Sequence, residues 1–213
     1  MDEEIQLINT NTRKEKIKNF FLTNRKKLII FFSIFIILLI IFFIFLDIKE
    51  KARVKIAEKY NQITSKYLED KDQEIKNELV EIIYKNDSTY SPLALYFLID
   101  NNILKEKTET NKLFDQVINK NSFDKEIKEL VIYKKALYNS DSSTEQVLLD
   151  ILNPIINKES IWKSHAQYLL AEYFYSKNEK NKSKEFLNEI ISQKNSNSNI
   201  RLEAQKKLNR DFS

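Results

Sequence analysis

The chain has 213 residues, of which 31% are charged, and its formal net charge is +4 at pH 7. The absence of cysteine excludes disulfides and thiolate metal sites, and a single histidine leaves few residues for other metal or acid/base sites. The absence of glycine excludes glycine-based phosphate loops, and together with only two prolines it argues against hairpin-rich β-structure. We therefore predict an all-α protein with no cofactor and no enzymatic activity.

Residues 1–27 are expected to form a basic tail. They contain seven Lys or Arg and four Asp or Glu, whereas the rest of the chain contains 28 and 27. Because the remainder is balanced in charge, it lacks the basic face that binding to nucleic acid requires. Ile17, Phe20 and Phe21 are spaced along one side of a helix that could lie on anionic lipid headgroups, and a solvated tail is the alternative.

Residues 28–46 predict a transmembrane helix. Eighteen of these nineteen residues are apolar, and the exception is Ser33. A helix of this length spans about 28 Å, close to the hydrocarbon thickness of about 30 Å in a bilayer. Residues 47–54 lack the small-residue pattern that a signal peptidase reads, so we expect the span to remain attached.

The basic residues that flank this span predict its orientation. Seven Lys or Arg precede it and six follow it within residues 49–66, which is nearly a tie. Arg25, Lys26 and Lys27 form a tight cluster at the membrane edge, and such clusters are retained in the cytoplasm. We therefore expect a cytoplasmic N-terminus and a C-terminal domain on the opposite side of the membrane.

Residues 47–90 predict a long amphipathic helix that continues from the span, followed by a second helix over 72–85. Apolar residues of the first helix recur every three or four positions, as in a surface helix: Ile48, Ala52, Ile56, Tyr60, Ile63 and Tyr67. This stripe is expected to pack on the following domain, and pairing with a second copy is the alternative.

Residues 91–213 predict a helical-repeat domain. Ser91 and Pro92 are typical of a helix start, and Pro154 should kink or stop its helix. With no glycine available, asparagine is expected in the left-handed position after helices, at Asn86, Asn102, Asn139, Asn178 and Asn195. A capping box is expected at Ser142 with Glu145 or at Ser143 with Gln146. The expected helices cover residues 92–102, 110–120, 124–139, 144–153, 161–177, 180–193 and 197–210.

The most regular part of this domain, residues 161–191, resembles a degenerate tetratricopeptide (TPR) repeat. Its pattern of large-small, aromatic, turn and small residues is carried by Leu170 with Ala171, Phe174, Asn178 and Ser183. Ala136 lies 35 residues before Ala171, and Ile99 lies 37 residues before Ala136. These spacings predict three helical pairs, stacked as an α-solenoid, with a final capping helix.

The layout of the whole chain, over about residues 12–210, resembles the YfgM-type ancillary subunits of the bacterial SecYEG translocon. The residues that carry the resemblance are Phe20-Phe21 with Asn24 to Lys27, the run Tyr90 to Leu95, and Leu169 to Ala171. The resemblance implies a domain on the outer face of the bacterial inner membrane, in the periplasm, near the translocon and a membrane-anchored periplasmic chaperone. It implies no catalytic motif.

Three tyrosines occupy one position of the repeat, three residues before the aligned residues Ile99, Ala136 and Ala171: Tyr96, Tyr133 and Tyr168. We expect them to project into a groove formed by the first helices, because amphipathic rings are frequent interface anchors, and partial burial as packing residues is the alternative. Nearby candidates for the same groove are Asp100, His165, Glu172 and Tyr175. Carboxylate pairs such as Glu126 with Glu129 are expected on a solvated face.

Two functions are consistent with these features. The first is a non-enzymatic, membrane-tethered adaptor that binds a partner protein or an emerging polypeptide beside the bilayer. The second is a structural protein that self-associates through residues 48–67, for example in envelope assembly.

Overall fold

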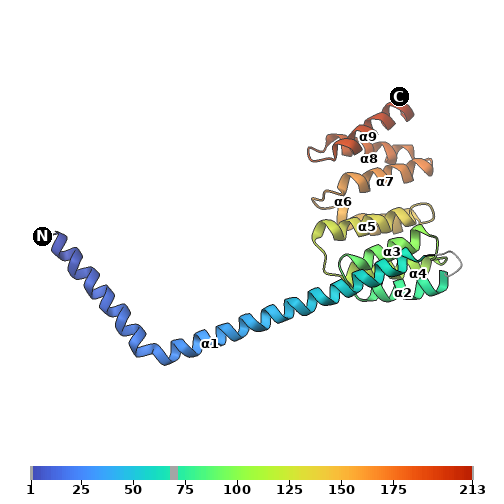
Figure 1. Ribbon diagram of the computed structural model, residues 1–213. Helices are drawn as coiled ribbons and strands as arrows, with labels where there is room; N and C mark the ends of the chain where they lie inside the picture. The colour runs from blue at the N-terminus through green and yellow to red at the C-terminus, as the bar shows by residue number, and fades with distance from the viewer. Residues whose placement is uncertain (1, 68–71, 213) are drawn as a thin grey trace. The chain divides into compact units, whose positions relative to one another are not determined.

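The computed structural model describes residues 2–67 and 72–212, and within these ranges it contains nine helices and no strand (Figure 1). The predicted all-α class is confirmed. The expected turn between the first two helices falls on residues 68–71 and lies outside the described residues, as do Met1 and Ser213. The helices are α1 Asp2–Ser65, α2 Asp72–Tyr84, α3 Tyr90–Asp100, α4 Lys107–Lys120, α5 Lys125–Asn139, α6 Glu145–Ile156, α7 Lys163–Ser176, α8 Lys180–Ser192 and α9 Ser198–Asp211.

The chain divides into two compact units, of which the first ends at Lys55 and the second begins at Ile56, within α1. The first unit contains the predicted span, and α1 passes through it without a break. The apolar side chains from Ile29 to Leu46 are 40–64% exposed, so nothing in this unit covers them. By length and composition this is a helix that can cross a membrane, with a mean hydropathy of 3.5 in its most apolar window.

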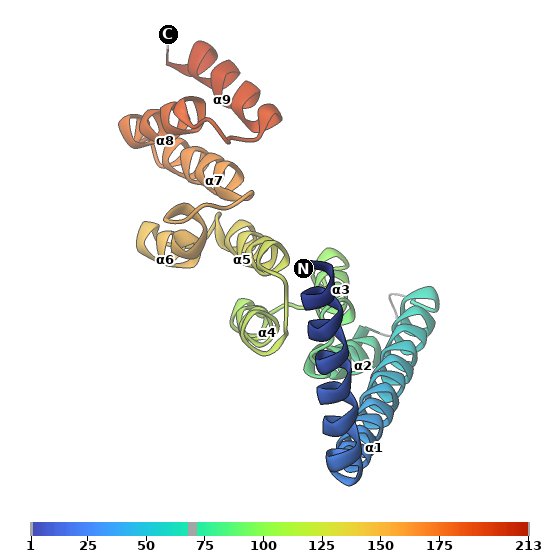
Figure 2. The same ribbon diagram turned by 90° about the vertical axis from the view of Figure 1, so that its left-hand side faces the viewer.

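The second unit consists of the end of α1 and helices α2 to α9, which follow one another in chain order (Figure 2). Consecutive helices pack on each other, as α2 does on α3, α5 on α6, α7 on α8 and α8 on α9. One core extends from Ile63 of α1 to Phe174 of α7, and a smaller core joins α7 and α8 to Ala204 of α9.

The apolar stripe at the end of α1 contributes to the core of the second unit. Ile63 is 5% exposed, and Ile56, Tyr60 and Tyr67 pack partly buried against the core. The Tyr60 ring lies 5.7 Å from the ring of Tyr90. The apolar stripe of residues 56–67 therefore packs within the chain. The sequence favours this packing over pairing with a second copy. Ile48, in the first unit, remains 61% exposed.

Several expected helix ends differ from the observed ones. Ser91 does not cap α3, because α3 begins at Tyr90 and Asp87 Oδ1 accepts hydrogen bonds from the amides of Thr89 and Tyr90. The expected capping box at Ser142 or Ser143 is also wrong. Both serine amides donate to the Asn139 carbonyl, so Thr144 becomes the residue that caps α6.

The prediction of left-handed asparagines is correct at three of five positions. Asn86, Asn102 and Asn178 have φ of 57°, 54° and 63°. Asn139 instead ends α5, where its buried side chain exchanges two hydrogen bonds with the amide of Asn111. The prediction is wrong at Asn195, because the chain leaves α8 in an extended conformation. There the Arg201 guanidinium donates to the carbonyls of Gln193 and Lys194.

Two buried serines join helices that are neighbours in sequence. Ser91 Oγ donates to the Ile82 carbonyl at 3.1 Å, and Ser183 Oγ donates to the Ala171 carbonyl at 2.8 Å. Both residues are 0% exposed. Each serine therefore fixes the position of one helix against the next.

We expect Ser183→Ala to lower the free energy of unfolding by about 1 kcal/mol, because a buried hydrogen bond between α7 and α8 is lost. Urea denaturation measures this change. Ser192→Ala is the matched control on the same helix: its hydroxyl is exposed and donates within α8, so its effect should stay below about 0.5 kcal/mol. Equal effects of the two variants would contradict the prediction.

Candidate partner-binding surface

The three repeat-position tyrosines lie on α3, α5 and α7, and all three are half-buried. Tyr96 of α3 places its hydroxyl in the interior, where it has no hydrogen-bond partner among the described residues. The ammonium of Lys134, on α5, lies 4.6 Å from the centre of the Tyr96 ring. A cation–π contact thus links the faces of α3 and α5.

Tyr133 belongs to an aromatic cluster between α5 and the start of α7. Its ring stacks on Trp162 at 5.9 Å, and His165 lies 5.1 Å from Trp162 and 6.1 Å from Tyr133. Trp162 Nε1 donates to the Glu126 carbonyl at 2.9 Å, which fixes the indole against α5. Burial lowers the pKa of His165, so its imidazole is neutral at pH 7.

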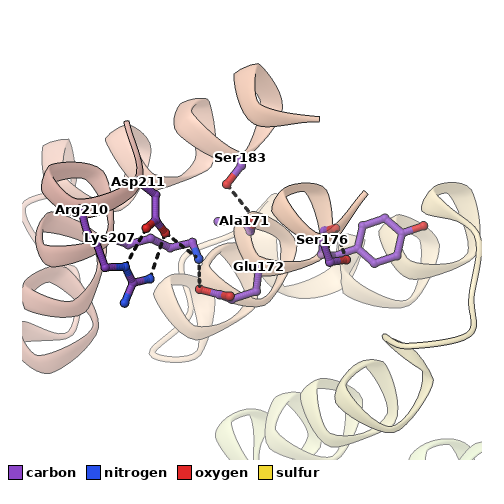
Figure 3. A network of polar contacts seen from close by, with 8 residues as sticks. Ala171, Glu172, Ser176, Ser183, Lys207, Arg210 and Asp211 are labelled. Atoms are coloured by element: carbon purple, nitrogen blue, oxygen red, sulfur yellow. Dashed lines mark hydrogen bonds and ion pairs between the residues drawn. The ribbon is translucent and has the colours of Figure 1, made fainter. Parts of the chain in front are cut away.

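Tyr168, Glu172 and Tyr175 follow one another on one face of α7. Glu172 meets Lys207 of α9 (Figure 3). Lys207 of α9 is 4% exposed, and its ammonium lies 2.9 Å from Glu172 Oε1 and 4.1 Å from the centre of the Tyr175 ring. Asp211 accepts from both Lys207, at 3.4 Å, and Arg210, at 2.6 Å. Glu172 and Tyr175 are therefore already engaged by α9.

The candidate residues thus form three contact groups rather than one cluster. Tyr96 contacts Lys134, Tyr133 and His165 contact Trp162, and the last three candidates meet α9. Asp100 is exposed at the end of α3 and forms no ion pair with a described residue. None of the seven lines any of the cavities of about 380 to 550 Å³ found in the described part of the second unit, so the expected groove stays a prediction.

Lys134, Trp162 and Lys207 complete these contacts and were not among the sequence candidates. Lys207 lies 35 residues after its partner Glu172, which is about one repeat. Extending the repeat period one step further along the sequence would have paired these two residues.

The expectation of solvated carboxylate pairs is wrong for Glu129. This side chain is 8% exposed, accepts a hydrogen bond from Ser160 Oγ at 2.7 Å and lies 3.9 Å from Lys125 Nζ. It therefore connects α5 to the loop before α7. Across the described part of the chain, no three His, Asp or Glu side chains gather in a way that could hold a metal ion.

The membrane-flanking residues Arg25, Lys26 and Lys27 belong to the first unit. All three are exposed on α1, directly before the apolar stretch. Their side chains are free to reach lipid headgroups from a span that begins at Leu28.

We expect the stability of the second unit to fall as the pH rises above 10, where tyrosines of the unfolded chain ionise. Burial raises the pKa of Tyr96 and Tyr133, and burial together with the Glu172 charge raises that of Tyr168 to about 12. The folded chain therefore holds these protons more tightly than the unfolded chain between pH 10 and about 12. Tyrosinate absorbance at 295 nm should show late-titrating tyrosines, and Tyr168→Phe should remove one of them.

No protein-family model matches the chain, and neither a curated protein sequence nor a solved structure matches it.

Proposed function

We propose that this protein is a non-enzymatic, membrane-anchored adaptor whose degenerate TPR-like repeats bind a partner protein beside the bilayer. The exposed apolar helix of the first unit supports the anchor, because an exposed run of this length is not stable in water. In this proposal the protein binds a partner and converts no substrate.

Contacts that recur at one sequence separation support the repeat architecture. Nine contacts that involve side chains of different structural elements join residues 33 to 37 positions apart, close to the TPR length of 34. They join Lys76 to Glu109, Asp87 to Asn121, Lys107 to Ser142, Glu126 to Trp162, Lys125 to Glu159, Glu145 to Lys182, Ser164 to Asn197, Glu172 to Lys207 and Tyr175 to Phe212. We infer three pairs, α3 with α4, α5 with α6 and α7 with α8, and α9 as the cap of an α-solenoid.

The observation that carries the binding proposal is the position of Tyr96, Tyr133 and Tyr168. They stand on the first helix of each inferred pair, and each is half-buried, so part of each side chain remains exposed. Rigid aromatic side chains held in this way bind partners at a low cost in conformational entropy. The face also offers Asp100 and Lys134 for polar contacts.

The resemblance to YfgM-type subunits supports the location that we propose. The protein would lie in the bacterial inner membrane, with Arg25, Lys26 and Lys27 in the cytoplasm and the repeats in the periplasm. Its partner would be a translocon subunit, a periplasmic chaperone or an emerging secreted chain. Alkaline phosphatase fused after Ser213 tests the orientation, since the fusion should be active only if the C-terminus is exported.

The adaptor is tested by replacing Tyr96, Tyr133 and Tyr168 together, with leucine to keep apolar volume and with alanine to remove it. Crosslinking in intact membranes followed by mass spectrometry should show partner capture by the wild type and its loss in both variants. Tyr84→Ala, at a tyrosine of α2 that is 55% exposed, is the control and should retain capture.

Self-association through residues 48–67 is the second candidate, and Ile48 supports it because this side chain is 61% exposed. Sedimentation in detergent separates the two functions. If the tyrosine variants lose partner capture and keep their oligomeric state, the adaptor is favoured. If Ile48→Lys dissociates an oligomer and the tyrosine variants keep partner capture, assembly is favoured.

A further inference from the structure

A cavity of about 440 Å³ lies between α4, α5 and α6, apart from the tyrosine face. Its apolar lining includes Ile118 of α4, Ile132 of α5 and Ile151 of α6, and Val147 at its edge is 47% exposed. Each helix contributes lining residues up to seven positions apart, which corresponds to about 10 Å along a helix. The cavity can therefore take a side chain with a long aliphatic stem together with an apolar neighbour.

Pro154 removes one backbone donor from the wall of this cavity. We predict from the sequence that this proline kinks or stops its helix, but α6 continues through it to Ile156. The buried side chains of Leu152 and Ile155, both 0% exposed, hold the last turn in place. Because proline has no N–H, the Asp150 carbonyl loses its helical donor, and Asp150 and Pro154 both line the cavity.

The donors around the cavity are already used within the protein. Asn111 donates to Asn139 Oδ1 and to the Lys107 carbonyl, and Asn139 donates to Asn111 Oδ1 and to the Lys135 carbonyl. Both hydrogens of each amide are therefore engaged. The Lys135 ammonium, whose side chain is 15% exposed, lies 2.7 Å from Asp115 Oδ1.

The acceptors exceed the donors. Asp115 and Asp150 give the lining two carboxylates against one ammonium, a net charge of −1. Gln146 Nε2 donates to Asp150 Oδ1 at 2.9 Å, which holds this carboxylate in place. With its own donors occupied and a net negative lining, the cavity is complementary to a cation that donates several hydrogen bonds.

We propose that this cavity binds an arginine side chain, flanked by aliphatic residues, from a partner polypeptide. The planar guanidinium offers five donors, enough for the Asp150 carboxylate and a second acceptor of the lining. Its methylene stem and an adjacent leucine or isoleucine would cover the isoleucines of the lining. A free amino acid would leave these apolar walls uncovered, which is the reason that we assign a polypeptide as the source. The site shares no residue with the tyrosine face, so either proposal can fail alone.

The test uses the full chain in detergent micelles and a fluorescein-labelled, end-blocked peptide that carries one arginine between leucines. Fluorescence anisotropy should show saturable binding, and replacing the arginine with uncharged citrulline should weaken it at least tenfold. Asp150→Asn should weaken binding of the arginine peptide about tenfold, since a charge-assisted hydrogen bond is lost. Asp141→Asn, at an exposed residue before α6, is the matched control and should bind as the wild type does.

Pro154→Ala separates binding from folding. It restores the N–H that pairs with the Asp150 carbonyl, so the urea midpoint should rise while peptide affinity falls at least threefold. Equal affinity for the arginine and citrulline peptides, or unchanged affinity in both Asp150→Asn and Pro154→Ala, would overturn the proposal. Dimerisation that Asp150→Asn abolishes, without any peptide binding, would also overturn it and identify a second copy as the occupant.

Discussion

Phe174→Ala should lower the free energy of unfolding of the second unit by about 3 to 5 kcal/mol. Phe174 is 1% exposed, and its ring stacks on Phe186 of α8 at a centroid distance of 5.7 Å and an angle of 6°. The ammonium of Lys182, also on α8, lies 4.9 Å from the same ring. Removing the ring therefore leaves a cavity and ends two contacts between α7 and α8. Since domains of this size are stable by about 5 to 15 kcal/mol, the loss is a large fraction of the total.

Urea denaturation of the full chain in detergent, followed by circular dichroism, measures this loss. Leu202→Ala is the control, because this apolar side chain of α9 is 54% exposed and its removal should cost less than about 0.5 kcal/mol. A double variant that also replaces Phe186 should show a coupling of about 0.5 to 1.5 kcal/mol between the two rings. A change below about 1 kcal/mol for Phe174→Ala would show that α7 and α8 do not share a rigid core.

The helices could be predicted because their evidence is local. The apolar run from Leu28 to Leu46 defines a long helix by composition alone, and the asparagines at 86, 102 and 178 mark helix ends without glycine. The errors occur where packing overrides a local rule. Pro154 stays inside α6 because the last turn buries Ile155, and Asn139 stays helical because its side chain pairs with Asn111 on another helix.

The candidate surface was less predictable for the same reason. The half-buried state of Tyr96, Tyr133 and Tyr168 follows from their shared repeat position. Their partners do not, because Lys134 and Trp162 reach them from other elements, and the burial of Lys207 requires Glu172, Asp211 and Tyr175 at once. A one-dimensional pattern shows which face a residue occupies, but it does not show which charge a neighbouring helix brings to that face.

Replacing Ile36, Ile37 and Leu38 with aspartate should abolish stable integration of the protein into membranes. Each of the eighteen apolar residues of the span favours insertion by roughly 0.3 to 0.6 kcal/mol, which gives about 8 kcal/mol in total. An aspartate at the centre of a span instead costs about 2.5 to 3.5 kcal/mol. Three aspartates therefore add about 9 kcal/mol and also remove three favourable residues. The balance then disfavours a helix in the hydrocarbon core.

Alkaline carbonate extraction of membranes measures the result, since integral proteins stay in the pellet. The wild type should remain there, and so should a control in which the same three positions exchange isoleucine and leucine. The aspartate variant should appear in the supernatant, because its helix no longer stays in the hydrocarbon core. Wild-type protein found entirely in the supernatant would remove the anchor, and with it the proposal that the repeats act beside a bilayer.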